Sequence, residues 1–301
     1  MMETRHSFTA DTAGLRLDKA IASQLEGISR VRIQRLIEQG LVRVNSLVSK
    51  PSYRLDKGDE VVITIPEPEP SHLIAQKIPI QIIYEDKDIL VVDKPAGLSV
   101  HPGPGHPDST LVNAVLGYAP QVCGGEAGRP GIVHRLDKDT SGLIIIALNP
   151  ESHVYLANQF KTRQVKKTYT ALVRGNLAPA TGFIDAPIGR DRSHRKKMAV
   201  TSAGNGRLAR TGYRVMEYIS SYTLLQVMPE TGRTHQIRVH LAAIGHPILG
   251  DTTYGFHSNL LSRQFLHASS LIFKLPSSGD KVEFSSPLPQ DLEKVIGSLR
   301  S

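Results

Sequence analysis

The sequence predicts an α+β protein with two domains. Residues 66–70 alternate proline with glutamate, a composition that interrupts helices and strand ladders and forms a stiff linker. After them, strand-like and short helical segments follow each other without the regular alternation of a doubly wound fold. The 301 residues are enough for a large domain and a smaller one. We expect a first domain over 1–66, a linker over 67–78 and a second domain over 79–301.

Two helical patterns are predicted in the first domain. Apolar residues follow helical spacing between 17 and 25, and again between Ser29, the expected N-cap, and Gly40, the expected end. Short strands are expected over 41–45 and 61–65. The first domain is therefore expected to contain two helices followed by strands.

One face of the second expected helix is basic. Arg32 and Arg35 lie opposite its apolar residues, which suits either an ordinary solvated surface or contact with RNA. The segment 15–66 resembles the alpha-L (S-four-like) RNA-binding domain in its order of helices, basic residues and strands. This resemblance implies that Arg32 and Arg35 contact RNA.

The second domain is expected to mix strands and helices. Ser109 is the expected N-cap of its first helix, and Val154 and Ala157 are expected on the packed face of the second. Strand patterns cover 89–93, 143–148, 168–173 and 222–228, and helical patterns cover 110–118, 151–162 and 234–244.

A cluster of polar and charged residues lies between two apolar segments at 134–141. A buried strand needs no such cluster beside it, so these side chains are expected to line a site at a strand end. An isolated loop aspartate is usually a turn former or a helix cap, and Asp139, which precedes Thr-Ser-Gly, is interpreted in that way. Asp137 requires further context.

That context comes from three segments that resemble the motifs of one enzyme family. Residues 134–142 are His-Arg-Leu-Asp-Lys-Asp-Thr-Ser-Gly, 166–173 are Lys-Lys-Thr-Tyr-Thr-Ala-Leu-Val, and 231–240 are Thr-Gly-Arg-Thr-His-Gln-Ile-Arg-Val-His. Together they resemble the large family of pseudouridine synthases that modify ribosomal and transfer RNA. The resemblance implies a catalytic domain built on a mixed, mainly antiparallel sheet with flanking helices.

The resemblance also implies roles for individual residues. Asp137 would be the catalytic carboxylate, Tyr169 would lie against the target base, and Arg238 would pair with the aspartate. The position of Arg238 between two apolar residues independently favours a partly buried, partnered charge. The remaining candidates are expected to contact RNA or support the site: Arg135, Arg233, His235, Arg195 and Lys196.

Composition excludes several other classes of protein. Lys and Arg outnumber Asp and Glu by 36 to 28, which suits a polyanionic partner. The single cysteine, Cys123, excludes an intramolecular disulfide.

His235 and His240 are five residues apart, without the spacing of a helical metal site, and no metal is expected. Without a signal-like or membrane-spanning segment, we expect a cytoplasmic monomer with no membrane partner.

The resemblance implies isomerisation of uridines in RNA without a cofactor. Domain order and motif spacing are most similar to synthases acting on the large ribosomal subunit, so its RNA or a precursor is the expected substrate. Transfer RNA stays open as a target. Asp137 could attack the anomeric carbon or remove the 2′ proton. The alternatives are a non-catalytic RNA-binding or ribosome-assembly protein of the same fold and a hydrolase that releases the base, although sugar hydrolases typically use two carboxylates.

Overall fold

The computed structural model describes residues 4–25, 28, 30–66, 73–103, 108–123, 129–191, 193–194, 197–202 and 204–301. The chain divides into two compact units, Met1–Ser71 and His72–Ser301. The division lies inside the segment 67–78 that was expected as the linker.

The first unit contains two helices and a four-stranded antiparallel sheet, ordered β1-β4-β2-β3. Its elements are β1 (Thr4–Thr9), α1 (Leu17–Gln24), α2 (Arg30–Glu38), β2 (Val42–Val44), β3 (Leu47–Val48) and β4 (Glu60–Ile65). Gly40 follows α2 with a positive φ of 74°, a conformation that suits glycine and confirms it as the stop. Ser29 lies outside the described residues. The two helices and the strands predicted over 41–45 and 61–65 are confirmed, whereas β1 and β3 were not predicted.

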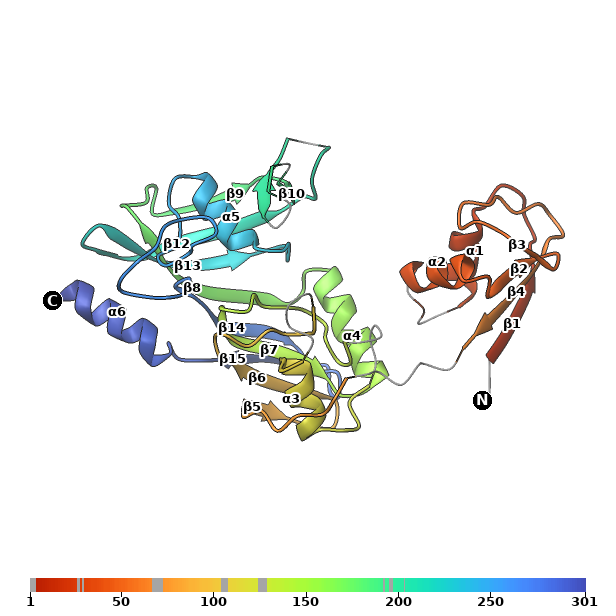
Figure 1. The fold of residues 1–301 in the computed structure, drawn as a ribbon, viewed down its shortest axis with the longest axis horizontal. Coiled ribbons are helices and arrows are strands. Elements are labelled where there is room, and N and C mark those ends of the chain that lie inside the picture. The colour runs from red at the N-terminus through yellow and green to blue at the C-terminus, as the bar shows by residue number, and fades with distance from the viewer. Residues whose placement is uncertain are drawn as a thin grey trace. The chain divides into compact units, whose positions relative to one another are not determined.

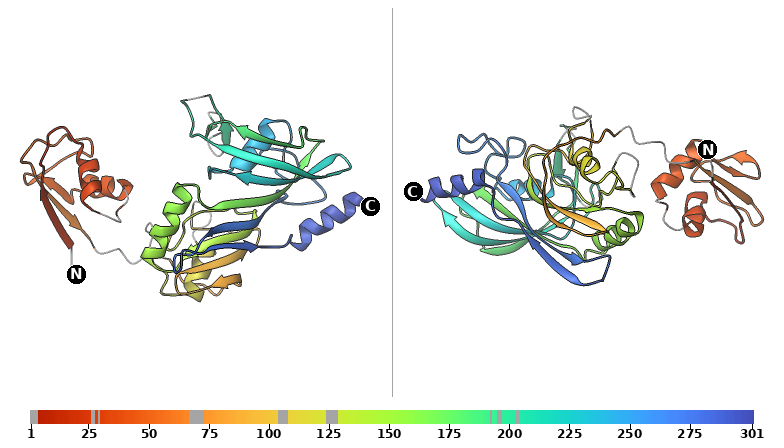
Figure 2. Two further views of the ribbon diagram at one scale, coloured as in Figure 1. Left: turned by 180° about the vertical axis from the view of Figure 1, so that it is seen from behind. Right: turned by 90° about the horizontal axis from the view of Figure 1, so that it is seen from below.

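The second unit is built on a nine-stranded sheet with the order β5-β6-β7-β14-β8-β13-β12-β9, and β15 pairs with β14 (Figures 1 and 2). Its elements are β5 (Gln81–Glu85), β6 (Ile89–Lys94), α3 (Leu111–Tyr118), β7 (Ser141–Ala147), α4 (Pro150–Lys161), β8 (Lys166–Arg174), β9 (Thr181–Asp185), β10 (Ile188–Arg190), β11 (Met198–Val200), β12 (Arg210–Ile219), β13 (Tyr222–Pro229), α5 (Gln236–Ala243), β14 (Leu266–Lys274), β15 (Lys281–Ser285) and α6 (Gln290–Arg300). Among the paired strands of the described residues only β7 and β14 run parallel, so the predicted α+β fold with a mixed, mainly antiparallel sheet is confirmed.

Both faces of the central strands are buried, which explains their continuous apolar sequences. Alternate residues of β7 pack on opposite sides: Ile144 and Ile146 join a core that includes α3 and α6, whereas Leu143 and Ile145 join a second core with α4. β10 and β11 form a separate two-stranded hairpin, against which α5 packs. Within the described part of the chain, no helix is long and apolar enough to cross a membrane.

Two local predictions were wrong. α3 has Thr110, not Ser109, at its N-cap, and Asn113 Oδ1 accepts hydrogen bonds from the Thr110 backbone N–H and hydroxyl at 3.0 and 2.6 Å. Val154 of α4 is 56% exposed, and Leu156 is the fully buried apolar residue of that helix. The polar residues Ser152 and Gln159 are also buried on α4, so hydrophobic spacing alone misassigned its face.

The start of β7 tolerates only glycine at Gly142. Its φ is +109°, and a Cβ there would lie 2.3 Å from the carbonyl oxygen of Ala268, its partner on β14. We expect Gly142→Ala to destabilise the protein by roughly 2 kcal/mol or more, because strain and a backbone clash add together. Gly279 has a φ of +75° with no atom within 4 Å of the added Cβ. Urea unfolding of Gly142→Ala and of the control Gly279→Ala measures the loss in free energy of unfolding. Equal losses in the two variants would contradict a contribution from the clash.

Candidate active site

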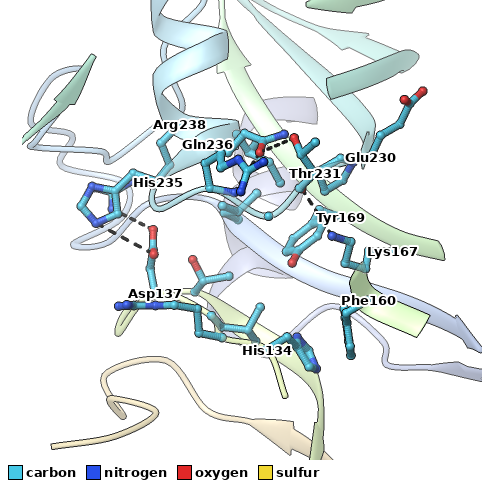
Figure 3. Close-up of a pocket in the computed structure, with 18 of the residues that line it drawn as sticks. His134, Asp137, Phe160, Lys167, Tyr169, Glu230, Thr231, His235, Gln236 and Arg238 are labelled. Carbon is cyan, nitrogen blue, oxygen red and sulfur yellow. Dashed lines mark hydrogen bonds and ion pairs between the residues drawn. The ribbon is translucent and has the colours of Figure 1, made fainter. Parts of the chain in front are cut away.

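A cavity of about 510 Å³ lies beside the central strands of the second unit. Its walls come from the loop before β7, the beginning of β8, the loop after β13 and the first turn of α5 (Figure 3). The three sequence motifs therefore meet at one cavity, and Asp137, Tyr169 and Arg238 all line it.

The His-Arg-Leu-Asp segment sends successive side chains in different directions. Leu136 is 4% exposed and belongs to the main core, whereas Arg135 is exposed and borders the cavity. The Asp137 side chain is 16% exposed and points toward His235 and Arg238 in Figure 3. Burial of Leu136 thus fixes the loop that presents the carboxylate.

His134 has a structural function in this loop. Its Nε2 accepts a hydrogen bond from the backbone N–H of Ile145 at 2.9 Å, and its ring stacks on Phe160 with centroids 4.6 Å apart. Burial, with a smaller contribution from the charge of Lys167, lowers the pKa of His134 to about 3. His134 is therefore neutral, carries its proton on Nδ1, and ties the motif to β7.

Arg238 connects two aspartates. Its Nη1 donates to Asp137 Oδ2 at 3.0 Å, while Nε and Nη2 donate to the two oxygens of Asp251 at 2.7 and 2.9 Å. All three side chains are buried or nearly so, at 8%, 16% and 1% exposure for Arg238, Asp137 and Asp251. A planar guanidinium can satisfy both carboxylates at fixed angles, which an ammonium cannot do.

These contacts shift the pKa values of both members of the buried pair. Burial opposes the charge on Arg238, but its hydrogen bonds to Asp251 and the charges of Asp137 and Asp251 raise the pKa of Arg238 above its usual value. Burial alone would raise the pKa of Asp251, yet its hydrogen bonds from Arg238 and from two backbone N–H groups hold that pKa below the usual value. The pair is therefore charged at neutral pH.

A buried lysine also restrains the backbone of the loop that carries Asp137. Lys94 is fully buried, and its Nζ donates to the carbonyl oxygens of Pro95, Leu98 and Lys138 at 2.8, 2.8 and 2.9 Å. Burial lowers the pKa of Lys94 to about 7, although three carbonyl acceptors suit the three protons of the ammonium. Lys138 follows Asp137 directly, so this contact fixes the backbone of the candidate catalytic residue.

Tyr169 and Lys167 form the wall opposite Asp137 (Figure 3). They are two residues apart on β8 and therefore on one face of the strand. Burial, and then the negative charge of Asp137, raise the pKa of Tyr169, so that its phenol stays protonated. Burial lowers the pKa of Lys167 to about 8, and its Nζ donates to the carbonyl oxygen of Thr231 at 3.4 Å.

The loop that leads into α5 is held by Gln236. Its Oε1 accepts hydrogen bonds from the Thr231 hydroxyl and the Arg233 backbone N–H at 2.7 and 3.0 Å, and its Nε2 donates to the Arg210 carbonyl oxygen at 3.0 Å. His235 precedes Gln236 in the left-handed conformation, with φ of 55°. This backbone directs His235 Nε2 toward Asp137 Oδ1, 3.9 Å away.

The predicted RNA-contacting residues are distributed over different parts of the structure. Arg135, Arg233 and His235 border the cavity around Asp137. Arg32 and Arg35 are exposed on α2 of the first unit. Arg195 and Lys196 lie outside the described residues.

Sequence reasoning missed three residues that support the site. Asp251 and Tyr254 belong to a polar segment, Asp-Thr-Thr-Tyr-Gly, which follows the buried residues Ile248 and Leu249 after one glycine. Polar residues at the end of an apolar run are the signal that identified Asp137, and it could have found Asp251. Lys94 gave no comparable signal, since a lysine is rarely buried.

The described residues contain no group of three or more His, Cys, Asp or Glu side chains that could hold a metal ion. The donor set around Asp137 consists of one carboxylate, one guanidinium and one imidazole, with Asp251 occupied by Arg238. These groups can orient a carboxylate and supply positive charge within a cavity.

Comparisons with known proteins identify relatives over nearly the whole chain. The profile of the family described as RNA pseudouridylate synthase matches residues 88–243, and that of the S4 domain matches residues 15–61. An uncharacterized RNA pseudouridine synthase, YlyB of Bacillus subtilis, is 44% identical over 95% of this chain and 94% of its own length. The ribosomal large subunit pseudouridine synthase D of Zymomonas mobilis is 42% identical over 97% of this chain and 96% of its own.

A solved structure supports the same assignment. The human RNA Pseudouridylate Synthase Domain Containing 1 has a TM-score of 0.58 and 28% identity, covering 77% of this chain and 98% of its own. The sequence-based family resemblance is confirmed by these comparisons.

The buried pair between Arg238 and Asp251 gives a first test of the site. We expect Asp251→Asn to reduce the free energy of unfolding by about 3 kcal/mol at neutral pH, because the buried guanidinium loses a charged partner. Since the pKa of Asp251 is lowered on folding, its contribution is present at neutral pH and is lost as pH falls through that pKa, below 3.8. The difference in the free energy of unfolding between Asp251→Asn and wild type should therefore become smaller in acid.

Asp291→Asn is the matched control for this experiment. Asp291 also makes two hydrogen bonds to an arginine, Arg263, at 2.7 and 3.0 Å, but its side chain is 47% exposed. Its loss should cost about 1 kcal/mol or less. Urea titrations from pH 3 to 7 measure both variants, and similar losses would show that burial of the first pair has no special energetic effect.

Proposed function

We propose that this chain, which belongs to the RNA pseudouridylate synthase family, uses the Asp137 carboxylate to isomerise uridine in RNA. The supporting observation is that Asp137 lies in the cavity where all three motifs meet and is held there by the buried Arg238. The reaction breaks the bond between N1 of the base and the sugar, joins carbon 5 to the same sugar carbon, and replaces the proton lost from carbon 5 by one gained on the freed nitrogen. One nucleotide is rearranged, so no electrons are exchanged with a second reactant.

Asp137 is the group that acts on the sugar. Its Oδ2 is held by Arg238, and Oδ1 faces the cavity on the side of His235. A carboxylate fixed in this way is prepared either to attack the anomeric carbon or to accept the 2′ proton. Both routes place the ribose of the target nucleotide directly beside Asp137.

Tyr169 and Lys167 receive the base. The buried Tyr169 ring offers a flat surface for an extruded pyrimidine. Its raised pKa favours packing and hydrogen-bond donation by the neutral phenol over removal of the carbon 5 proton. A uracil that leaves the sugar carries negative charge, and the Lys167 ammonium on the same wall stabilises that charge.

A second cavity, of about 690 Å³, continues the site toward the β10–β11 hairpin. It shares Arg135 and Arg233 with the first cavity and adds Arg190 and Arg207. Burial lowers the pKa of Arg233, and the nearby charges of Arg207 and Arg163 lower it further. Crowded cations of this kind favour a bound polyanion, and we assign this groove to RNA phosphates.

Arg135 borders both cavities and is exposed at their junction. Extruding a base costs a few kcal/mol of stacking, so a side chain that occupies the vacated space assists the step. The planar guanidinium of Arg135 can stack on the neighbouring bases from this position. It is our candidate for that role.

The substrate we propose is RNA of the large ribosomal subunit or its precursor. Relatives from Zymomonas mobilis and Nitrosomonas europaea are named ribosomal large subunit pseudouridine synthase D. The S4 domain adds a second contact with RNA through the exposed Arg32 and Arg35 of α2. An enzyme with this substrate works as a cytoplasmic monomer in our proposal.

The assignment of Asp137 has a direct test. We expect Asp137→Asn to abolish pseudouridine formation, since the amide can neither attack the sugar nor accept its proton, while RNA binding persists. Carbodiimide primer extension on unmodified large-subunit RNA and on transfer RNA measures the product and identifies the target uridines. Asp139→Asn is the control, because Asp139 lies two residues away and is not among the cavity-lining residues. Activity retained in Asp137→Asn would contradict the proposal.

The groove makes a separate prediction about salt. Arg207→Ala should weaken RNA binding and reduce the slope of log K against log salt by about 1, as expected for one lost phosphate contact. Arg214→Ala is the control, since Arg214 is exposed on β12 and does not line the groove. Filter binding at several salt concentrations measures both slopes. Equal slopes in the two variants would remove the groove from the RNA path.

A further inference from the structure

Tyr254 links the β10–β11 hairpin to the active site. Its hydroxyl accepts a hydrogen bond from the backbone N–H of Met198, the first residue of β11, at 2.8 Å. Met198 and Tyr254 also pack against the small apolar cluster that contains Ile188 of β10. The hairpin lines the basic groove through Arg190 and Met198, so RNA in that groove would lie against the same segment.

The same hydroxyl contacts His235. The distance from Tyr254 Oη to His235 Nδ1 is 2.8 Å, and the two rings meet edge to face with centroids 5.6 Å apart. A hydroxyl that accepts the Met198 N–H and donates its own proton uses both its donor and its acceptor function, which favours donation to Nδ1. This arrangement requires the proton of His235 to be on Nε2, the nitrogen that faces Asp137 Oδ1 at 3.9 Å.

Charged groups on every side of His235 are compatible with this neutral tautomer. Asp137 and Asp251 attract a positive ring, whereas Arg238 and Arg135 repel it. Burial is the largest influence and lowers the pKa of His235. In the other tautomer Nδ1–H would donate to the Tyr254 hydroxyl, and the lone pair of Nε2 would face the carboxylate of Asp137.

Tyr254 is itself rigidly held. Asp251 Oδ1 accepts its backbone N–H at 3.1 Å, and the Arg238 guanidinium carbon lies 5.2 Å from the centre of its ring. Tyr254 thus contacts the hairpin, His235 and the buried Arg238–Asp251 pair. A shift of the hairpin would reach the carboxylate through this residue.

We propose that Tyr254 and His235 are positioning residues that couple the β10–β11 hairpin to Asp137. The hairpin orients the Tyr254 hydroxyl, the hydroxyl fixes the tautomer of His235, and Nε2–H restrains Asp137 Oδ1 while Arg238 holds Oδ2. At 3.9 Å the restraint requires a bridging hydroxyl or water, or a small closure when RNA binds. This inference rests on the proposed roles of Asp137 and of the groove.

Tyr254→Phe tests the relay because it keeps the ring and removes only the hydroxyl. In single-turnover reactions with saturating RNA, we expect the rate of pseudouridine formation to fall about tenfold while the Kd for RNA changes less than twofold. Tyr218→Phe is the control: it removes a hydroxyl that donates to the Leu177 carbonyl oxygen at 2.9 Å and that lines none of the cavities described above. The control should retain the wild-type rate.

A double mutant separates a relay from two independent effects. If Tyr254 acts through His235, then Tyr254→Phe should cause no further loss in a His235→Ala background. Nitrogen NMR of the histidine rings, with His235 assigned by its loss in the alanine variant, should show the Nε2–H tautomer in wild type and a mixture in Tyr254→Phe.

Three results would overturn the relay: an unchanged rate in Tyr254→Phe, additive losses in the double mutant, or the Nδ1–H tautomer in the wild-type spectrum. Failure of the proposed function looks different, since the wild-type protein would then form no pseudouridine. In that case the spectra alone decide whether Tyr254 sets the tautomer of His235.

Discussion

The site depends on one buried guanidinium shared between two carboxylates. Arg238 reaches Asp137, 101 residues earlier in the chain, and Asp251, 13 residues later. A buried arginine without partners is strongly unfavourable. Arg238 can therefore stay buried beside Asp137 only because Asp251 also neutralises it. Asp251 supplies two of the hydrogen bonds and fixes the plane of the guanidinium, which in turn fixes the single contact with Asp137. The carboxylate proposed to react is thus positioned by one that is not among the residues lining the cavity.

The backbone of the Asp137 loop is restrained as firmly as its side chain. Lys94 Nζ donates to the Lys138 carbonyl oxygen, and Arg263 Nη1 donates to the Asp139 carbonyl oxygen at 3.2 Å. Gly142 allows β7 to approach β14 closely. Asp139, which was interpreted as part of a turn, takes part through its main chain. Such restraint suits a group that must keep its orientation while a base rotates beside it.

The sequence was informative where function needs several polar residues close together in the chain. The three motifs identified Asp137, Tyr169 and Arg238, and the apolar runs identified β6, β7, β8 and β13. Asp251, Tyr254 and Lys94 were missed because their importance comes from contacts made only after folding, such as the hydrogen bond from Lys94 to Lys138, 44 positions later in the chain. The face of α4 was misassigned because its buried Gln159 donates to the Lys274 carbonyl oxygen of β14, a partner that no local pattern reveals.

The charges of the site divide into two groups with different tasks. Arg238 is neutralised, since two carboxylates surround it and together they leave the triad with a net charge of −1. It therefore contributes orientation and little attraction for RNA. In our proposal the attraction comes from the cations of the groove, for which the described residues show no such close carboxylate: Arg233, whose Nε donates to the Leu208 carbonyl oxygen, and Arg207. Catalytic geometry and RNA affinity thus rest on different side chains, and a mutation can change one while leaving the other intact.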